Sequence, residues 1–200
     1  MAREQAATFM AEAARAFYGH GWLMGTSGNL SVRMSPDTFL ISASGKDKGA
    51  LRPSDFLLCG MDALPAEETN HRPSAETHVH AVLYAKFPEV GAIFHCHEPY
   101  AALCSSRDEA RTATTFQGLE MIKGLDIWDE DAEVSVPIVA NYADIPQLAV
   151  AIGDVARAEV PGVNVLRHGF YAWGATPFAA KRHVESLAYL YRYSWEWSRR

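Results

Sequence analysis

The segment "GAIFHCHEPY", residues 91–100, places two histidines one residue apart at the end of an apolar run. Alternate residues of a strand face the same side, so His95 and His97 are expected to point together while Cys96 points away. Two imidazoles on one face can chelate a divalent metal. The alternative is a pair of histidines hydrogen-bonded at a strand end, because burying polar rings without partners is costly.

A third metal ligand would strengthen the first interpretation, and six other histidines are available. His78 and His80 lie on a predicted helix, where residues two apart do not share a face. His183 follows two basic residues in the predicted last helix, and we expect it to face solvent or a partner. His168 comes just after the apolar run "VNVL" and precedes a glycine. A histidine at a strand end beside a turn is well placed to complete a site. The remaining two candidates are His20 and His71.

Three short segments rich in glycine and hydroxyl residues could bind an anion. "GTSGN" at 25–29 and "SASGKD" at 42–47 offer backbone N–H groups and hydroxyls, and such turns can form anion-binding nests. Ser74, at a predicted helix start, adds a hydroxyl beside helix amides that favour negative charge. Each segment alone can be an ordinary turn. Together with the candidate metal site, they suit a phosphorylated substrate held at one end and metallated at the other.

Two glutamates are candidates for proton transfer. Glu76 falls in the first turn of the predicted helix, where a carboxylate can also simply compensate the helix dipole. Glu120 lies in "FQGLEMIKGL", an apolar stretch with glycines on both sides. Apolar surroundings raise the pKa of a carboxyl group toward neutrality, which suits acid–base work. An exposed helix residue is the other interpretation of Glu120, and the sequence leaves both open.

Composition indicates a globular protein rather than a nucleic-acid binder. The 200 residues suit one domain over 1–200, and the net charge of −6 lacks a basic footprint. An anionic substrate therefore needs local cationic or amide groups. Three cysteines without a C-x-x-C pair favour a reducing cytosol, so we expect a cytoplasmic protein. No apolar run is long enough to span a membrane, and no signal peptide is recognisable.

Hydrophobic periodicity and turn signals predict helices that flank a mixed sheet. The predicted helices cover residues 2–19, 74–88, 99–106, 144–159 and 176–197. Asp144 and Thr176 are expected to cap the last two, and Ser74 the second. The predicted strands cover residues 30–35, 38–44, 55–61, 90–97 and 134–140, and 162–174 form a strand pair or one long strand.

The order of "GTSGNLS", "ISASGKDKG", "RPSAETHVHAVLY", "HCH" and "RHGFYAWG" resembles the class II aldolase/adducin family over about residues 21–191. The resemblance implies a three-layer α/β/α sandwich around a largely antiparallel mixed sheet. It also implies one zinc ion per subunit, held by His95, His97 and His168. A homotetramer with the site near a subunit interface is implied as well.

The same resemblance assigns substrate-binding and acid–base residues. Glu76 matches the acid/base of the aldolases, and Glu120 matches that of the family's dehydratases. Lys123, one helical turn from Glu120, could help to bind an anionic substrate. Ala75 stands where many aldolases have a second serine, so it offers an amide but no hydroxyl. The phosphate is expected among Thr26, Ser27, Gly28, Asn29, Ser44, Gly45 and Ser74.

Within the family, the segments "ISASGKDKG", "GLEMIKGL" and "RHGFYAWG" are most similar to the branch that dehydrates a methylthiopentulose phosphate in methionine salvage. We therefore expect a zinc-dependent hydro-lyase. The alternative is a fuculose- or ribulose-phosphate type aldolase or epimerase that uses the same zinc-stabilised enediolate. A non-enzymatic, adducin-like assembly module is disfavoured because such relatives lack the metal histidines. A metal-dependent hydrolase lacks an obvious additional base.

Overall fold

The computed structural model describes all 200 residues and contains one eight-stranded sheet. The strand order is β3-β2-β1-β4-β8-β7-β6-β5. All neighbouring strands pair antiparallel except β6 and β7, which are parallel. The strands are β1 (Asn29–Arg33), β2 (Thr38–Ser42), β3 (Phe56–Gly60), β4 (Ala92–Cys96), β5 (Ala113–Gln117), β6 (Glu133–Val139), β7 (Gly162–Val165) and β8 (Gly169–Gly174).

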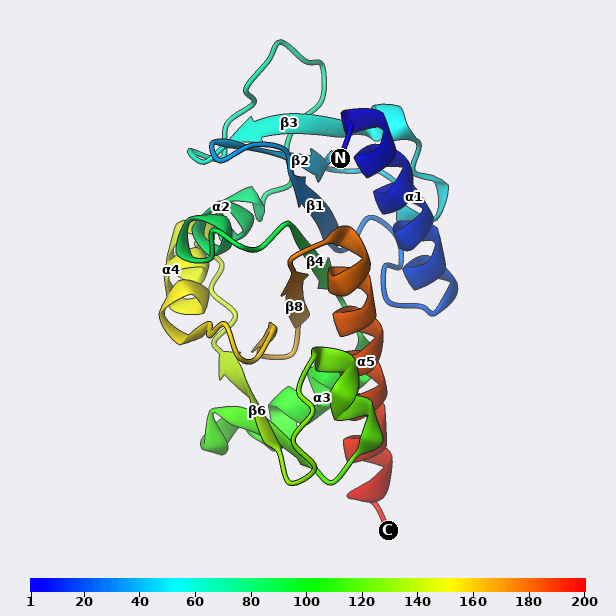
Figure 1. Ribbon diagram of the computed structural model, residues 1–200, viewed down its shortest axis with the longest axis vertical. Coiled ribbons are helices and arrows are strands. Elements are labelled where there is room, and N and C mark those ends of the chain that lie inside the picture. The colour runs from blue at the N-terminus through cyan, green and yellow to red at the C-terminus, as the bar shows by residue number, and fades with distance from the viewer.

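Helices cover both faces of this sheet. The α-helices are α1 (Arg3–Gly19), α2 (Thr77–Lys86), α3 (Pro99–Arg107), α4 (Ile145–Val155) and α5 (Pro177–Trp197). Short 3-10 helices are η1 (Lys48–Ala50), η2 (Pro53–Asp55), η3 (Glu109–Arg111) and η4 (Glu120–Leu125). In Figure 1, α2 and α4 lie on one side of the central strands and α1 and α5 on the other. The predicted three-layer α/β/α sandwich with a largely antiparallel sheet is confirmed.

Two hydrophobic cores follow from these layers. One lies between the sheet and α1, α3 and α5, and the other between the sheet and α2 and α4. Strand β4 alternates between them, since Phe94 and Cys96 belong to the first core and Ile93 to the second. His95 shares the face of Ile93, so its ring lies on the α2 side. Cys96 points away from it into packing, as the two-residue period predicts.

Capping side chains and prolines define where several helices begin. Asp144 accepts a hydrogen bond from the backbone N–H of Gln147, and Thr176 accepts one from Ala179. Both predicted caps are confirmed. The predicted cap at Ser74 is wrong, because α2 begins only at Thr77. Residues 74–76 form a turn instead, and this turn leaves the Ser74 hydroxyl facing Asn29, whose Nδ2 is 3.1 Å away.

The structure differs from the sequence-based predictions at two other places, and packing explains both. Strand β5 lies at the sheet edge, and its threonine-rich sequence "ATTFQ" gave no strand prediction. His183 is buried rather than facing solvent, because α5 packs on β8 and η4. Its Nδ1 donates to the carbonyl oxygen of Trp173 at 2.6 Å, and its Nε2 lies 3.3 Å from Asp126 Oδ2. This histidine therefore holds α5 against the sheet.

The C-terminal end of β4 meets the start of β8 at an unusually close backbone contact. His168 lies in the turn between β7 and β8, and Gly169 follows it with φ of +153°. A Cβ at Gly169 would lie 2.1 Å from the carbonyl oxygen of Cys96. Only glycine permits this approach. The contact brings His168 to the end of β4, where His95 and His97 lie.

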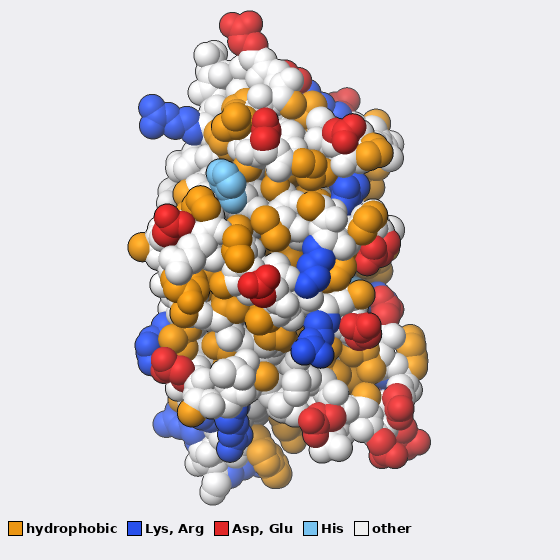
Figure 2. All heavy atoms as spheres, turned by 90° about the vertical axis from the view of Figure 1, so that its left-hand side faces the viewer, with side chains coloured by type: hydrophobic (Ala, Val, Ile, Leu, Met, Phe, Trp, Pro, Cys, Tyr) orange, Lys and Arg blue, Asp and Glu red, His pale blue; other side chains and the backbone are white.

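The surface that carries α2 and α4 shows acidic and basic side chains interspersed among hydrophobic ones (Figure 2). No patch of one charge sign dominates this face. This face therefore provides no long-range field that would attract an anionic ligand. None of the helices combines the length and apolar character needed to cross a membrane.

Candidate active site

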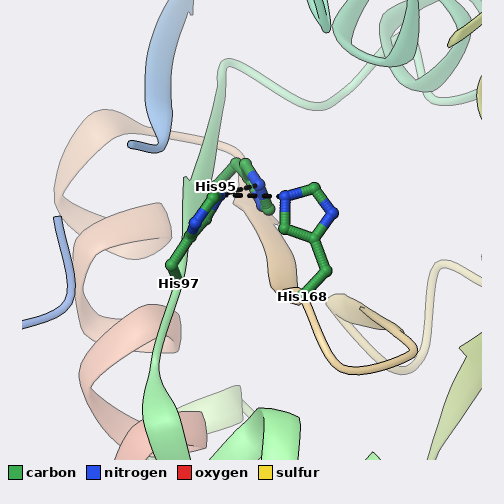
Figure 3. Close-up of side chains that lie close together, drawn as sticks. All are labelled: His95, His97 and His168. Carbon is green, nitrogen blue, oxygen red and sulfur yellow. Dashed lines mark hydrogen bonds between the residues drawn. The ribbon is translucent and has the colours of Figure 1, made fainter. Parts of the chain in front are cut away.

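Three imidazole rings converge at the end of β4 (Figure 3). Nε2 of His97 lies 3.1 Å from Nε2 of His95 and 3.0 Å from Nε2 of His168. The ligand atoms of the three residues all lie within 4.8 Å of one another. His95 and His97 come from β4 and the residue just after it, and His168 comes from the turn before β8. The fold thus assembles a three-nitrogen cluster from segments 71 residues apart.

The orientation of His95 is fixed by two contacts. Its Nδ1 donates a hydrogen bond to the backbone oxygen of Phe170 at 3.0 Å. Its ring stacks on Tyr171, with centroids 4.1 Å apart and an interplanar angle of 12°. Since Nδ1 carries the proton, Nε2 presents a lone pair to the cluster. In metal sites, the ring nitrogen that does not bind the metal commonly donates to a backbone carbonyl in this way.

The cluster fits a shared cation. Two nitrogen ligands of tetrahedral zinc, each about 2.0–2.1 Å from the ion, lie roughly 3.3 Å apart. The distances of 3.0 and 3.1 Å between the imidazole nitrogens are close to that value. Burial, followed by repulsion from the neighbouring rings, lowers the pKa of His97 to about 3, and the pKa of His168 is also lowered. Neutral imidazoles with facing lone pairs are the metal-binding form.

Glu76 lies beside this cluster in the turn before α2. Its side chain is 12% exposed, and its Oε2 accepts a hydrogen bond from Asn29 Nδ2 at 2.7 Å. Its oxygens lie 3.4 Å from His95 Nε2 and 3.5 Å from His168 Nε2. Burial by itself would raise the pKa of this carboxyl, but His95, His168 and the Asn29 amide together lower it to about 2. The structure therefore presents an ionised carboxylate next to the three nitrogens.

A pocket of about 330 Å³ opens beside the cluster. His97, His168 and Glu76 line it, together with Ala75 at the position where the hydroxyl of a second serine is missing. The seven residues expected around a phosphate all line the same pocket: Thr26, Ser27, Gly28, Asn29, Ser44, Gly45 and Ser74. Gly28 is required by geometry, because its φ is +70° and a Cβ would lie 2.6 Å from the backbone oxygen of His95. Three turns far apart in the chain thus form one polar cavity.

Lys48 also lines this pocket, although no sequence motif singled it out. Its side chain is almost fully buried, and its ammonium group donates to the backbone oxygens of Thr26 and Lys46, each at 3.1 Å. Burial lowers the pKa of Lys48, and Asp47 opposes this effect. Its position just beyond "SASGKD" was the available signal. Only the fold shows that Lys48, and not Lys46, turns into the cavity.

Glu120 and Lys123 lie elsewhere on the same chain, on η4. The Glu120 side chain is 84% exposed and accepts a hydrogen bond from Lys123 Nζ at 2.9 Å. Both residues line a separate hollow of about 560 Å³. Of the two interpretations that the sequence left open for Glu120, the exposed one holds within one chain, because η4 turns this side chain outward. The structure therefore brings Glu76, but not Glu120, to the three histidines of its own chain.

An α/β/α sandwich with a three-histidine centre beside an anion-suited pocket defines a metal-dependent enzyme of the class II aldolase type. The chain belongs to the class II aldolase and adducin N-terminal domain family, whose model matches residues 9–195. The predicted family membership is thereby confirmed.

Known proteins similar to this chain include dehydratases of similar sequence and an aldolase of the same fold. The chain is 41% identical over 178 residues to a methylthioribulose-1-phosphate dehydratase of Persephonella marina, covering 88% of this chain and 82% of that one. It is 40% identical over 187 residues to the Bacillus subtilis protein of the same name, covering 92% and 89%. The structure of L-fuculose-1-phosphate aldolase from Thermus thermophilus superimposes with a TM-score of 0.77 at 21% identity and full coverage of both chains. That lower identity supports the fold alone.

The three-nitrogen cluster predicts how metal content responds to substitution. We expect His95→Ala to lose the bound divalent metal, because one of three ligands is removed. Chelation should lower the melting temperature of the wild-type protein, since metal binds only the folded state. The same treatment should leave His95→Ala unaffected. Elemental analysis and thermal unfolding measure both effects.

His78→Ala is the matched control for this experiment. His78 is an exposed histidine on α2 that lies outside the cluster, so its removal should leave metal content unchanged. A His95→Ala protein that still carries one metal ion per chain contradicts the ligand set.

Proposed function

We propose that this chain dehydrates 5-methylthio-D-ribulose 1-phosphate to 2,3-diketo-5-methylthiopentyl 1-phosphate, a step of methionine salvage. The observation that carries the proposal is the shared pocket, in which His97 and His168 adjoin the hydroxyls and turns suited to a phosphate. The identity of about 40% to dehydratases of this name, over most of both chains, specifies the substrate. The three free cysteines fit a cytoplasmic enzyme.

The anionic end of the substrate is held by the chain itself. Residues of the two glycine turns and three residues that carry hydroxyls, Thr26, Ser44 and Ser74, line the cavity. Lys48 contributes the positive charge, because its buried ammonium contacts only backbone oxygens and lacks a carboxylate partner. A phosphate in this cavity would compensate that charge. Lys48 therefore belongs to the proposed phosphate site.

The reaction removes a proton from C3 and the hydroxyl from C4, and the enol that results takes a proton at C4 to become the ketone. His95, His97 and His168 would hold a zinc ion, one per subunit, which would supply a Lewis acid for the negative charge that develops on the substrate. The ionised Glu76 lies beside those three residues, where it can accept the C3 proton or orient the substrate. An acid must still protonate the departing hydroxyl.

We assign Glu120 to the leaving-group proton, with Lys123 as its partner. Within one chain Glu120 is exposed and paired only with Lys123, so it does not reach its own histidines. Trp128, which lines the same hollow, is 70% exposed and suits burial against another molecule. We therefore propose a homotetramer in which η4 of one subunit completes the site of its neighbour.

A product assay tests the proposed reaction. Purified protein should convert 5-methylthio-D-ribulose 1-phosphate to a product lighter by one water, as measured by mass spectrometry. A chelator should abolish this conversion, and added Zn²⁺ should restore it. L-fuculose 1-phosphate serves as the comparison substrate. Cleavage of that sugar phosphate without turnover of the methylthio substrate would establish the aldolase alternative instead.

Glu120→Gln should lower kcat by about 100-fold or more, because general acid–base groups contribute roughly 10²–10⁴-fold. Metal content should not change, since Glu120 lies apart from the histidines of its chain. Glu130→Gln is the matched control, because Glu130 is an exposed acid that lines the same hollow. Near-wild-type kcat in Glu120→Gln would show that another group handles the proton.

Mixed assemblies extend this test to the subunit arrangement. Glu120→Gln and His97→Ala subunits, unfolded together and reassembled, should regain part of the lost activity, because some sites then combine intact parts of both chains. The arrangement in which η4 serves a neighbour is contradicted if the mixture stays inactive while wild-type protein, unfolded and reassembled in the same way, recovers its activity.

Lys48→Met should raise KM for the phosphorylated substrate by about 10- to 100-fold, because a charge-assisted contact is worth roughly 1.5–3 kcal/mol. Inorganic phosphate should also inhibit this variant less strongly. Lys46→Met is the control, since its ammonium pairs with Asp55 at 3.0 Å outside the cavity. Steady-state kinetics measures both variants, and an unchanged KM in Lys48→Met excludes this lysine from the phosphate site.

A further inference from the structure

A line of buried hydrogen bonds runs from Glu76 into the core on the α2 side. His80, fully buried on α2, places its Nε2 2.5 Å from Asn29 Oδ1 and its Nδ1 2.6 Å from Ser31 Oγ. Ser31 Oγ in turn lies 2.8 Å from the Tyr84 hydroxyl. At the other end, Asn29 Nδ2 donates to Glu76 Oε2 at 2.7 Å. The site carboxylate is thus connected to four buried polar side chains.

The amide of Asn29 determines the direction of the hydrogen bonds in this line. Its nitrogen can only donate, and it lies 2.7 Å from Glu76 Oε2 and 3.1 Å from Ser74 Oγ. Asn29 Oδ1 then faces His80, and His80 Nε2 must carry a hydrogen. Nδ1 of the neutral ring accepts from the Ser31 hydroxyl, which accepts from Tyr84. The tautomer with its hydrogen on Nε2 satisfies all of these contacts, whereas the Nδ1–H tautomer would leave Nε2 and Asn29 Oδ1 as two acceptors facing each other.

The side-chain amide of Asn29 is fully engaged by protein atoms. Its two N–H groups face Glu76 Oε2 and, at 3.1 Å, Ser74 Oγ, while its oxygen faces His80. Asn29 was expected among the phosphate ligands. Its contacts instead suit it to hold two other site residues, a carboxylate and a hydroxyl, in fixed positions.

We propose that His80 is a positioning residue, whose Nε2–H fixes the amide of Asn29 and thereby the carboxylate of Glu76 beside the histidine centre. Without this donor, the Asn29 amide can rotate and turn its oxygen toward the carboxylate. The carboxylate, whose oxygens lie 3.4 and 3.5 Å from the imidazole nitrogens of His95 and His168, would then lose its only short hydrogen bond. The kinetic part of this inference rests on the proposed function.

Two substitutions distinguish the role of Nε2 of His80 from that of Nδ1. The side-chain nitrogen of glutamine can occupy the place of Nε2, so His80→Gln keeps a donor to Asn29. The asparagine side chain ends near the place of Nδ1, so His80→Asn keeps the Ser31 contact and loses the donor. We expect His80→Asn to lower kcat at least about 10-fold with KM within about 2-fold, and His80→Gln to retain kcat within about 3-fold.

Tyr84→Phe is the control for a merely structural effect. It removes a buried hydroxyl at the far end of the line, so it should lower stability while leaving kcat within about 3-fold. The positioning role is overturned if His80→Asn keeps wild-type kcat, if His80→Gln is as impaired as His80→Asn, or if KM rises instead of kcat falling.

A substrate-free measurement keeps the inference separate from the proposed reaction. In protein labelled with ¹⁵N-histidine, nitrogen chemical shifts report the tautomer of each ring. We expect a buried neutral imidazole with its proton on Nε2, and its signals should disappear in His80→Gln. Loss of a ring protonated on Nδ1, or on both nitrogens, overturns the inference. Absence of dehydratase activity in a wild-type protein with the expected tautomer overturns the proposed function alone.

Discussion

The contact between the start of β8 and the end of β4 is the constraint on which the site depends. Gly169 lets the two backbones approach so closely that no side chain fits between them. His168 is thereby brought against His97, and the backbone oxygen of Phe170 is brought against His95. The same antiparallel pairing lays Tyr171 under the ring of His95. Metal binding and ligand orientation therefore have one structural origin.

Around this contact, buried polar side chains take the place of apolar packing. Glu76, Asn29, His80 and Ser31 form a line whose hydrogen bonds satisfy one another. Lys48 differs from them, since its charge is met by backbone oxygens alone. A fully satisfied line is rigid, whereas a buried ammonium group without an ion-pair partner favours an anionic ligand. The two arrangements suit two tasks, which are to hold a carboxylate still and to attract a phosphate.

The chain separates the parts of its proposed chemistry between two surfaces. The histidines, Glu76 and the anion pocket come from the centre of the sheet, where strands from both halves of the chain meet. Glu120 and Lys123 lie on η4, a short helix held to α5 by Arg182 and Asp126. If Glu120 acts as proposed, the site becomes complete only by association, which links the proposed reaction to the proposed assembly.

Local rules in the sequence determined much of this protein. The two-residue period paired His95 with His97, helix caps were readable at Asp144 and Thr176, and the order of motifs identified the family. Tertiary structure decided what depends on segments far apart: the approach of His168, the burial of Lys48 and His183, and the outward direction of Glu120. Periodicity describes which side of one element a residue faces. It carries no information on which distant element packs against that side. That packing determines the burial of the residue, its hydrogen-bond partners and the charges around it.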